Sequence, residues 1–204
     1  SYGTARPELN DAPPEGYFAG LTLIGDLGRR FWLCETRAQS LAIIDPLAVR
    51  ERIVLSALVK RFSSGELERE PAGLFSKTLE LPFDDARALL ELQGPLKALG
   101  LDVEAFGGDT VAIKRVPHEL HAADLAPLLK QLSHTVRVGD QQSQLLGLVQ
   151  MAHAAVPETS GALSHTEGRA ALSQLDAIDF SMRPVRHKVV VTELPLLQLV
   201  AMAR

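Results

Sequence analysis

The chain has 204 residues, enough for one large domain or two small ones, and its 46% hydrophobic and 23% charged residues are an ordinary globular balance. A net charge of −4 leaves no surplus of Lys and Arg to neutralise phosphates, so we expect weak or no direct DNA binding. The single cysteine excludes an intrachain disulfide, and no apolar run reaches the ~20 residues of a membrane span, so we expect a cytoplasmic protein that contacts no membrane.

The first third of the chain changes character at Tyr17. Residues 1–16 contain three prolines and two glycines, which predicts the disordered end of a linker from a longer, N-terminally extended chain. Short apolar runs between turn residues then predict strands near 18–24, 30–36 and 40–44. Apolar residues at helical spacing predict a helix from about 47 to 62.

The middle of the chain follows a polar loop at 63–74. We expect a strand at 76–81, and then a helix that Gly94-Pro95 kinks or divides. Strands at 101–106 and 110–115 flank Gly107-Gly108-Asp109, which is a hairpin signal, and a helix follows near 122–135. This order of elements resembles part of the split βαβ motif of ferredoxin-like folds.

The last part of the chain is expected to hold helices near 140–156 and 165–175, a strand at 187–191, and a closing helix to about residue 203. Ser164 and Glu167 have capping-box spacing at the start of the second helix. Thr192 is expected to cap the closing helix.

One segment carries a family resemblance. Ile43-Ile44-Asp45, Ala48 and Glu51-Arg52-Ile53 resemble the "DQHAxxER" motif of MutL C-terminal domains. Residues 99–106 are similar to the family's "LGF.VE.FG", and residues 111–117 to its "v.IR.VP". The shared order of these matches, from Tyr17 to the end, identifies the chain as MutL-like.

The resemblance also implies that the metal site of nicking MutL proteins is degenerate here. Asp45 and Glu51 remain as remnants, and Asp179 is a carboxylate where the family has a cysteine. The other ligand places hold residues that cannot bind a metal well: Leu47, Ala152 and Ser181. We therefore expect no catalytic residue, metal or cofactor, and expect Asp45 to cap the helix that follows it. His118, His121 and Asp124 could form a metal half-site, although a solvated helix entry is favoured.

Two surfaces are candidate binding sites. The C-terminal segment is strongly apolar and needs a cover, either the chain's own core or a twofold partner. Because the MutL resemblance implies a homodimer built from both ends of the domain, the candidate interface residues are Leu21, Leu23, Leu194, Leu197, Val200 and Ala201. A second segment falls where relatives carry a "QxxLxP" motif that docks on the replicative sliding clamp, and its residues are Lys77, Leu79, Leu81 and Pro82. A plain edge strand ended by proline is the favoured alternative.

The sequence thus predicts an α+β fold of two subdomains. Residues 17–70 and 141–204 would form a discontinuous dimerisation subdomain, and residues 71–140 an inserted ferredoxin-like external, or regulatory, subdomain. The function that the MutL resemblance implies is homodimerisation in DNA mismatch repair without nuclease activity, tethering two ATPase-bearing chains and docking repair proteins. The alternatives are a metal-dependent nicking enzyme using Asp45, Glu51 and Asp179, and an unrelated monomeric ligand-binding module.

Overall fold

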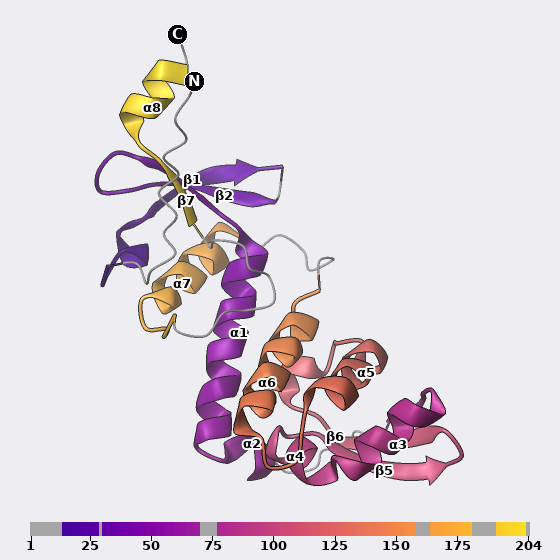
Figure 1. Ribbon diagram of the computed structural model, residues 1–204. Coiled ribbons are helices and arrows are strands. Elements are labelled where there is room, and N and C mark those ends of the chain that lie inside the picture. Colours follow the sequence, from indigo (N-terminus) through magenta and orange to yellow (C-terminus); the bar gives the residue numbers. More distant parts are fainter. Residues whose placement is uncertain (1–13, 29, 70–76, 158–163, 181–190, 203–204) are drawn as a thin grey trace, which may run out of the picture. The chain divides into compact units, whose positions relative to one another are not determined.

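The computed structural model describes residues 14–28, 30–69, 77–157, 164–180 and 191–202 (Figure 1). It confirms an α+β protein with two antiparallel sheets. The chain divides into two compact units: a first unit of residues up to Ile53 and from Glu158 onward, and a second unit of Val54–Pro157. In the described part of the chain, no helix is both long and apolar enough to cross a bilayer.

The first unit is built on a four-stranded sheet. Its strands are β1 (Thr22–Leu27), β2 (Phe31–Glu35), β3 (Leu41–Ile44) and β7 (Val191–Leu194), in the order β1-β2-β3-β7. All neighbours are antiparallel, and β7 brings the C-terminal part of the chain to the edge beside β3. Side chains along each strand alternate between the two faces, so the sheet has one inner and one outer face.

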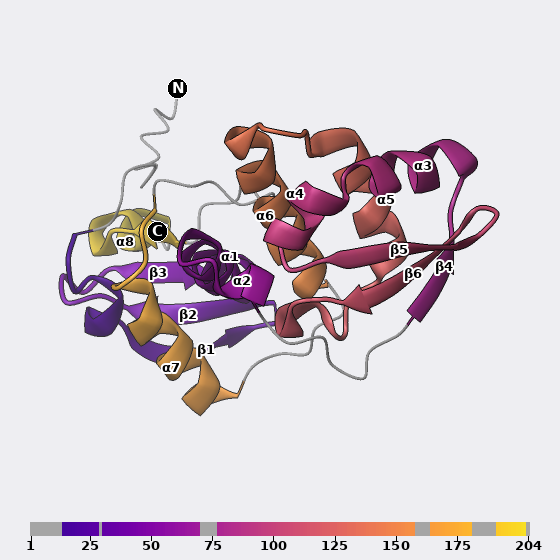
Figure 2. The ribbon, with the colours of Figure 1, turned by 90° about the horizontal axis from the view of Figure 1, so that it is seen from below.

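The inner face of this sheet carries the core of the first unit. It is covered by the 3₁₀ turn η1 (Phe18–Gly20), by α7 (His165–Leu175) and by the first half of α1 (Pro46–Ser63) (Figure 2). The core residues with the least exposed surface include Phe18, Trp32, Cys34, Ala42, Ile44, Ala48 and Leu175. Burial raises the pKa of the Cys34 thiol to about 11, so this cysteine stays protonated and acts as an apolar side chain.

Helix α7 begins where the sequence predicts. The Ser164 hydroxyl accepts the Glu167 backbone N–H at 3.3 Å, and the Glu167 carboxylate accepts the Ser164 backbone N–H at 2.8 Å. These reciprocal bonds are the predicted capping box, which is confirmed. They also lower the pKa of Glu167, because both the hydroxyl and the backbone of Ser164 hydrogen-bond to its carboxylate.

The C-terminal boundary differs from the prediction. Thr192 lies inside β7 and does not cap a helix; the final helix, α8 (Leu196–Met202), begins four residues later. Pairing of β7 with β3 extends the strand to Leu194, and Pro195 then donates no N–H to continue the ladder. The earlier part of the predicted strand, 187–190, lies outside the described residues.

The second unit holds a three-stranded sheet. Strands β4 (Lys77–Glu80), β6 (Thr110–Arg115) and β5 (Asp102–Gly107) lie in the order β4-β6-β5 with antiparallel neighbours. Along the chain the strands follow one another as β4, β5 and β6, but in the sheet β6 lies between β4 and β5. This is the predicted split βαβ arrangement. The connecting helix is divided into α3 (Phe83–Glu91) and α4 (Gln93–Ala98), as Gly94-Pro95 predicts.

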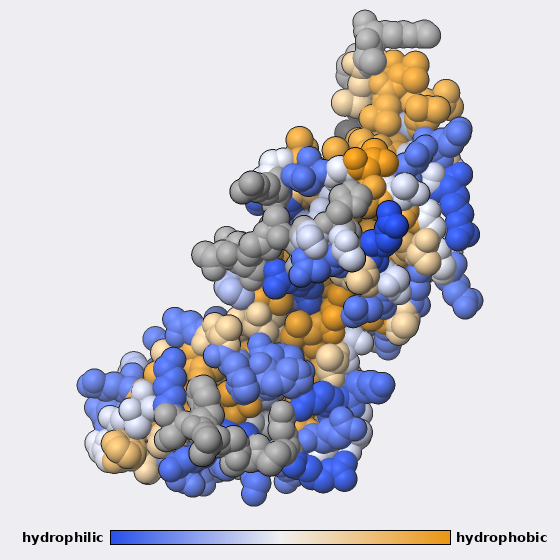
Figure 3. Space-filling view, turned by 180° about the vertical axis from the view of Figure 1, so that it is seen from behind, coloured by the Kyte–Doolittle hydropathy of each residue, from blue (hydrophilic) through white to orange (hydrophobic). Residues whose placement is uncertain are grey.

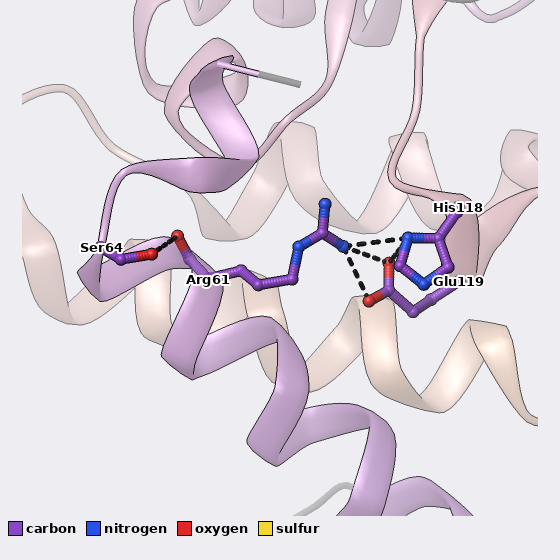
Figure 4. A network of polar contacts seen from close by, with 4 residues as sticks. All are labelled: Arg61, Ser64, His118 and Glu119. Atoms are coloured by element: carbon purple, nitrogen blue, oxygen red, sulfur yellow. Dashed lines mark hydrogen bonds and ion pairs between the residues drawn. The ribbon is translucent and has the colours of Figure 1, made fainter. Parts of the chain in front are cut away.

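The remaining elements of the second unit are helical. They are α2 (Glu66–Arg69), within the predicted loop, η2 (His118–Leu120), α5 (Leu125–Thr135) and α6 (Gln141–Ala155). Helix α6 packs on α5 and η2. Arg61, near the end of α1, binds both carboxylate oxygens of Glu119 at 2.9 and 3.0 Å, which fixes η2 to that helix (Figure 4).

The geometric units differ from the predicted functional division at two places. The second half of α1 and all of α6 belong to the second unit, whereas the sequence-based division assigns them to the dimerisation subdomain. The reason is packing, since α6 contacts α5 and η2 of the second unit. Which division the protein uses in its assembly stays a prediction.

Candidate functional site

The outer face of the first sheet carries a group of apolar side chains, beside the exposed polar residues Thr22, Glu35 and Thr192. Strand pairing places Leu33 opposite Ile43, and Leu41 opposite Leu194, all on the face away from Trp32 and Ile44. Each of these four side chains is only half-buried. Apolar side chains on the water-facing side of a sheet break the usual alternation of an antiparallel sheet with one solvated face, and so indicate a surface that a partner covers.

Helix α8 extends this apolar surface. It has no buried residue, and the exposed fractions are 85% for Leu197, 74% for Met202 and 50% for Leu196. Gln198 is the one polar residue in Leu196–Met202, so the helix is apolar around almost its whole circumference. A helix of this kind is stable in water only when it is enclosed. The space-filling view shows hydrophobic residues gathered over α8 (Figure 3).

The structure places the six predicted interface residues in two groups. Leu194, Leu197, Val200 and Ala201 all lie on β7 and α8, next to one another in the chain. Leu23 is 6% exposed and belongs to the core, and Leu21 packs partly buried against it. The strand neighbours Ile24 and Leu27, each 57% exposed, point outward instead. The register irregularity between Leu23 and Gly25 turns Leu27 outward, because Leu27 pairs with Phe31 whereas Leu23 pairs with Cys34; sequence periodicity did not reveal this.

The two remnants of the metal motif have structural positions. Asp45 Oδ1 accepts the backbone N–H of Leu47 at 2.9 Å and lies 3.4 Å from that of Ala48, so Asp45 caps α1 as predicted. Glu51 lies within α1 with no exposed surface. Asp179 is exposed beyond α7. Within the described ranges, three or more His, Cys, Asp or Glu side chains nowhere come together as metal ligands would.

The second candidate metal group also has structural contacts. His118 Nδ1 lies 3.1 Å from Arg61 Nη1 in the contact with Glu119 (Figure 4). Asp124 accepts the backbone N–H of Ala126 at 3.2 Å and is the N-cap of α5. The described geometry therefore places His118 and Asp124 at the entry to η2 and α5.

Two of the candidate clamp-docking residues, Lys77 and Leu79, lie on β4, and Leu81 and Pro82 follow directly after it. Strand β4 is at the edge of the second sheet, where it pairs with β6 alone among the described strands. Lys77, Thr78 and Pro82 are exposed, whereas Leu79 is half-buried. Leu81 is only 6% exposed, and its backbone N–H bonds to the carbonyl of Asp109 at 3.1 Å. Phe83, 62% exposed, is the accessible apolar side chain next to this strand.

Comparison with known proteins points to one family. The family described as "MutL C terminal dimerisation domain" matches residues 24–157. The chain is 41% identical to the DNA mismatch repair protein MutL of Myxococcus xanthus over all of its length, and 39% identical to that of Anaeromyxobacter dehalogenans over 96% of it. It is 33% identical to the MutL of Citrifermentans bemidjiense over 93% of its length. The chain spans 34%, 33% and 30% of the lengths of these three relatives.

The cap at Asp45 yields a stability prediction. We expect Asp45→Ala to lower the free energy of unfolding by about 1–2 kcal/mol, because two backbone N–H groups at the start of α1 lose their acceptor. Asp45→Asn keeps an acceptor oxygen and should lower the free energy of unfolding by only about a few tenths of a kcal/mol. Urea unfolding followed by circular dichroism measures both. Equal losses in the two variants would show that the charge of Asp45 matters more than its capping oxygen.

Proposed function

The chain belongs to the family of MutL C-terminal dimerisation domains, and we propose that it acts by holding two copies of its polypeptide together. The observation that carries this proposal is the set of apolar side chains on the outer face of the first sheet and on α8. We name this surface the sheet–helix face. It consists of Ile24, Leu27, Leu33, Leu41, Ile43, Leu194, Leu196, Leu197, Val200, Ala201 and Met202.

A second copy of the chain is the occupant that fits this face. Identical chains meet most often about a twofold axis, where the same patch contributes on both sides. The central residues of such a patch are apolar, as they are here. Enclosure of α8 requires contacts on more than one side of the helix, which a partner sheet and a partner α8 together provide.

The proposed consequence of dimerisation is tethering. The MutL relatives are about three times as long as this chain. We propose that the dimer joins two ATPase-bearing parts of such longer chains, so that their contact becomes intramolecular. Joining raises the effective concentration of the second contact to the millimolar range for short flexible linkers. Function in mismatch repair then depends on the strength of the dimer contact.

We further propose that this domain has no nuclease activity. Support comes from the residues at the motif: Asp45 caps α1, Glu51 is buried in the helix, and Leu47 replaces a ligand histidine. A metal site needs about four donors at one point. The rival proposal, a remodelled nicking site using Asp45, Glu51 and Asp179, has only carboxylates to offer.

Strand β4 supports a second, independent docking proposal. An edge strand has free backbone N–H and C=O groups and can accept an extended partner segment by strand addition. We propose that β4 docks on the sliding clamp through its backbone and through exposed Lys77, Thr78 and Phe83, because Leu81 is buried in the unit's own core.

The molar mass of the chain in solution tests the dimer proposal. Light scattering across a wide dilution range should give twice the monomer mass of 22.1 kDa for the wild-type chain. We expect Leu197→Asp to raise the dissociation constant about 100-fold or more, since a central apolar contact is replaced by a charge twice per dimer. Val138→Asp is the matched control: Val138 is 72% exposed on the second unit and should leave the constant unchanged. A wild-type chain that stays monomeric at high concentration refutes the proposal.

Nuclease activity is tested on supercoiled plasmid. With Mn²⁺, Mg²⁺ or Zn²⁺ added over a wide range, we expect no nicking above the buffer control, because the motif lacks enough donors for a metal. Nicking that is lost on Asp45→Asn, in a variant shown to fold by circular dichroism, would establish the rival proposal.

Clamp docking is tested by surface plasmon resonance on an immobilised bacterial sliding clamp. Thr78→Pro removes a backbone donor, and Phe83→Ala removes the accessible ring, so we expect each to weaken binding at least about fivefold. Phe106→Ala is the control, since Phe106 is equally exposed, at 67%, but belongs to β5. Binding by the wild type that neither substitution changes would exclude β4 as the docking strand.

A further inference from the structure

The first described residues of the chain join two segments that are distant in sequence. The backbone N–H groups of Phe18 and Ala19 bond to Asp176 Oδ1 and Oδ2 at 3.0 and 2.7 Å. The Tyr17 hydroxyl donates a hydrogen bond to Glu193 Oε2 at 3.1 Å. Residues 17–19, which we name the clasp, therefore bind the end of α7 and the strand β7 at the same time.

The clasp is also held by aromatic packing. Phe18 is 2% exposed, and its ring stacks on that of Phe180 with centroids 5.9 Å apart and planes 8° from parallel. Tyr17 meets Phe18 edge to face at 5.3 Å. The Arg52 guanidinium lies 4.3 Å from the centroid of Phe180, a cation–π distance. With this packing, the Tyr17 hydroxyl has a fixed position from which to bind Glu193.

The bond to Glu193 reaches β7 on its inner side. Glu193 pairs with Ala42, which is fully buried on the inner face of the sheet. Alternation then places Thr192 and Leu194 on the outer face. Burial and the neighbouring carboxylate of Glu193 raise the pKa of Tyr17, so its hydroxyl remains a hydrogen-bond donor throughout the neutral range.

Strand β7 needs such a restraint because of its position. Its described part, Val191–Leu194, is last in the order of the sheet and pairs with β3 alone among the described strands. Short edge elements open locally at low free-energy cost. Only Pro195 separates β7 from α8, so the direction in which β7 leaves the sheet also sets the direction of α8.

We propose that Tyr17 is a positioning residue for the dimer contact: through Glu193 it fixes β7, and β7 in turn fixes α8 against the second copy. This inference rests on the proposed function. It adds that the dissociation constant of the dimer depends on the contacts of the clasp. Its physical basis is preorganisation, since an interface element that is already ordered loses less conformational entropy on association.

The test compares dimer dissociation constants, measured by sedimentation equilibrium on the full chain. Tyr17→Phe keeps the ring packing and removes only the hydroxyl. It should weaken the dimer at least about fivefold, since each of the two protomers loses one hydrogen bond that orders β7. Glu193→Gln retains an acceptor oxygen and should stay within about twofold of wild type. The double variant should be no weaker than Tyr17→Phe alone, because both changes act on one contact.

A second readout isolates β7 from dimerisation itself. In the monomeric Leu197→Asp background, Tyr17→Phe should speed hydrogen exchange of the Val191–Leu194 amides and leave exchange in α7 unchanged. Ser164→Ala is the matched control: it removes the capping box of α7 in the same unit without touching β7. It should lower thermal stability but leave the dissociation constant unchanged.

The outcomes separate the two proposals. A wild-type chain that is monomeric at all concentrations overturns the proposed function. A dimeric wild type whose dissociation constant and β7 exchange are unmoved by Tyr17→Phe overturns the inference about the clasp alone. Equal weakening by Ser164→Ala would also overturn it, because general destabilisation of the unit would then account for the effect.

Discussion

The alternation of side chains across the four-stranded sheet is the constraint on which the first unit depends. Trp32, Cys34, Ala42 and Ile44 face inward because α7, α1 and η1 cover that side. The same alternation sends Leu33, Ile43 and Leu194 to the other side. Burial of the inner face stabilises the fold of the unit. The apolar side chains of the outer face form the surface that we propose a second copy covers.

The unit is closed by contacts between its two ends. β7 pairs with β3, Asp176 binds the backbone of η1, and Tyr17 binds Glu193. These contacts span more than 140 positions of sequence, so they are costly to form early in folding and are available only once both segments are present. A MutL dimerisation domain arranged in this way couples the segment before β1 to the strand and helix proposed to meet the second copy.

Two acidic residues of the family's motif, Asp45 and Glu51, have structural positions at the start of α1 and inside it. Asp45 supplies a capping oxygen to Leu47 and Ala48, and Glu51 is enclosed within α1. Capping of α1 needs one acceptor at one position, whereas a metal site needs several donors at a shared point. The first residue of the motif therefore has a structural role of its own in this chain, as the cap of α1.

The sequence by itself determined the family, the α+β class and most of the elements: the helix division that Gly94-Pro95 predicts, the hairpin at Gly107-Gly108 and the cap at Ser164 are all local signals. It also placed Leu194 and Leu197 in the apolar C-terminal segment. It could not show that Leu23 and Leu27, four positions apart, face opposite sides of the sheet, because the register irregularity in β1 lies between them. The end of β7 and the clasp at Tyr17 likewise depend on pairing with distant strands and helices, and only the tertiary structure supplies those partners.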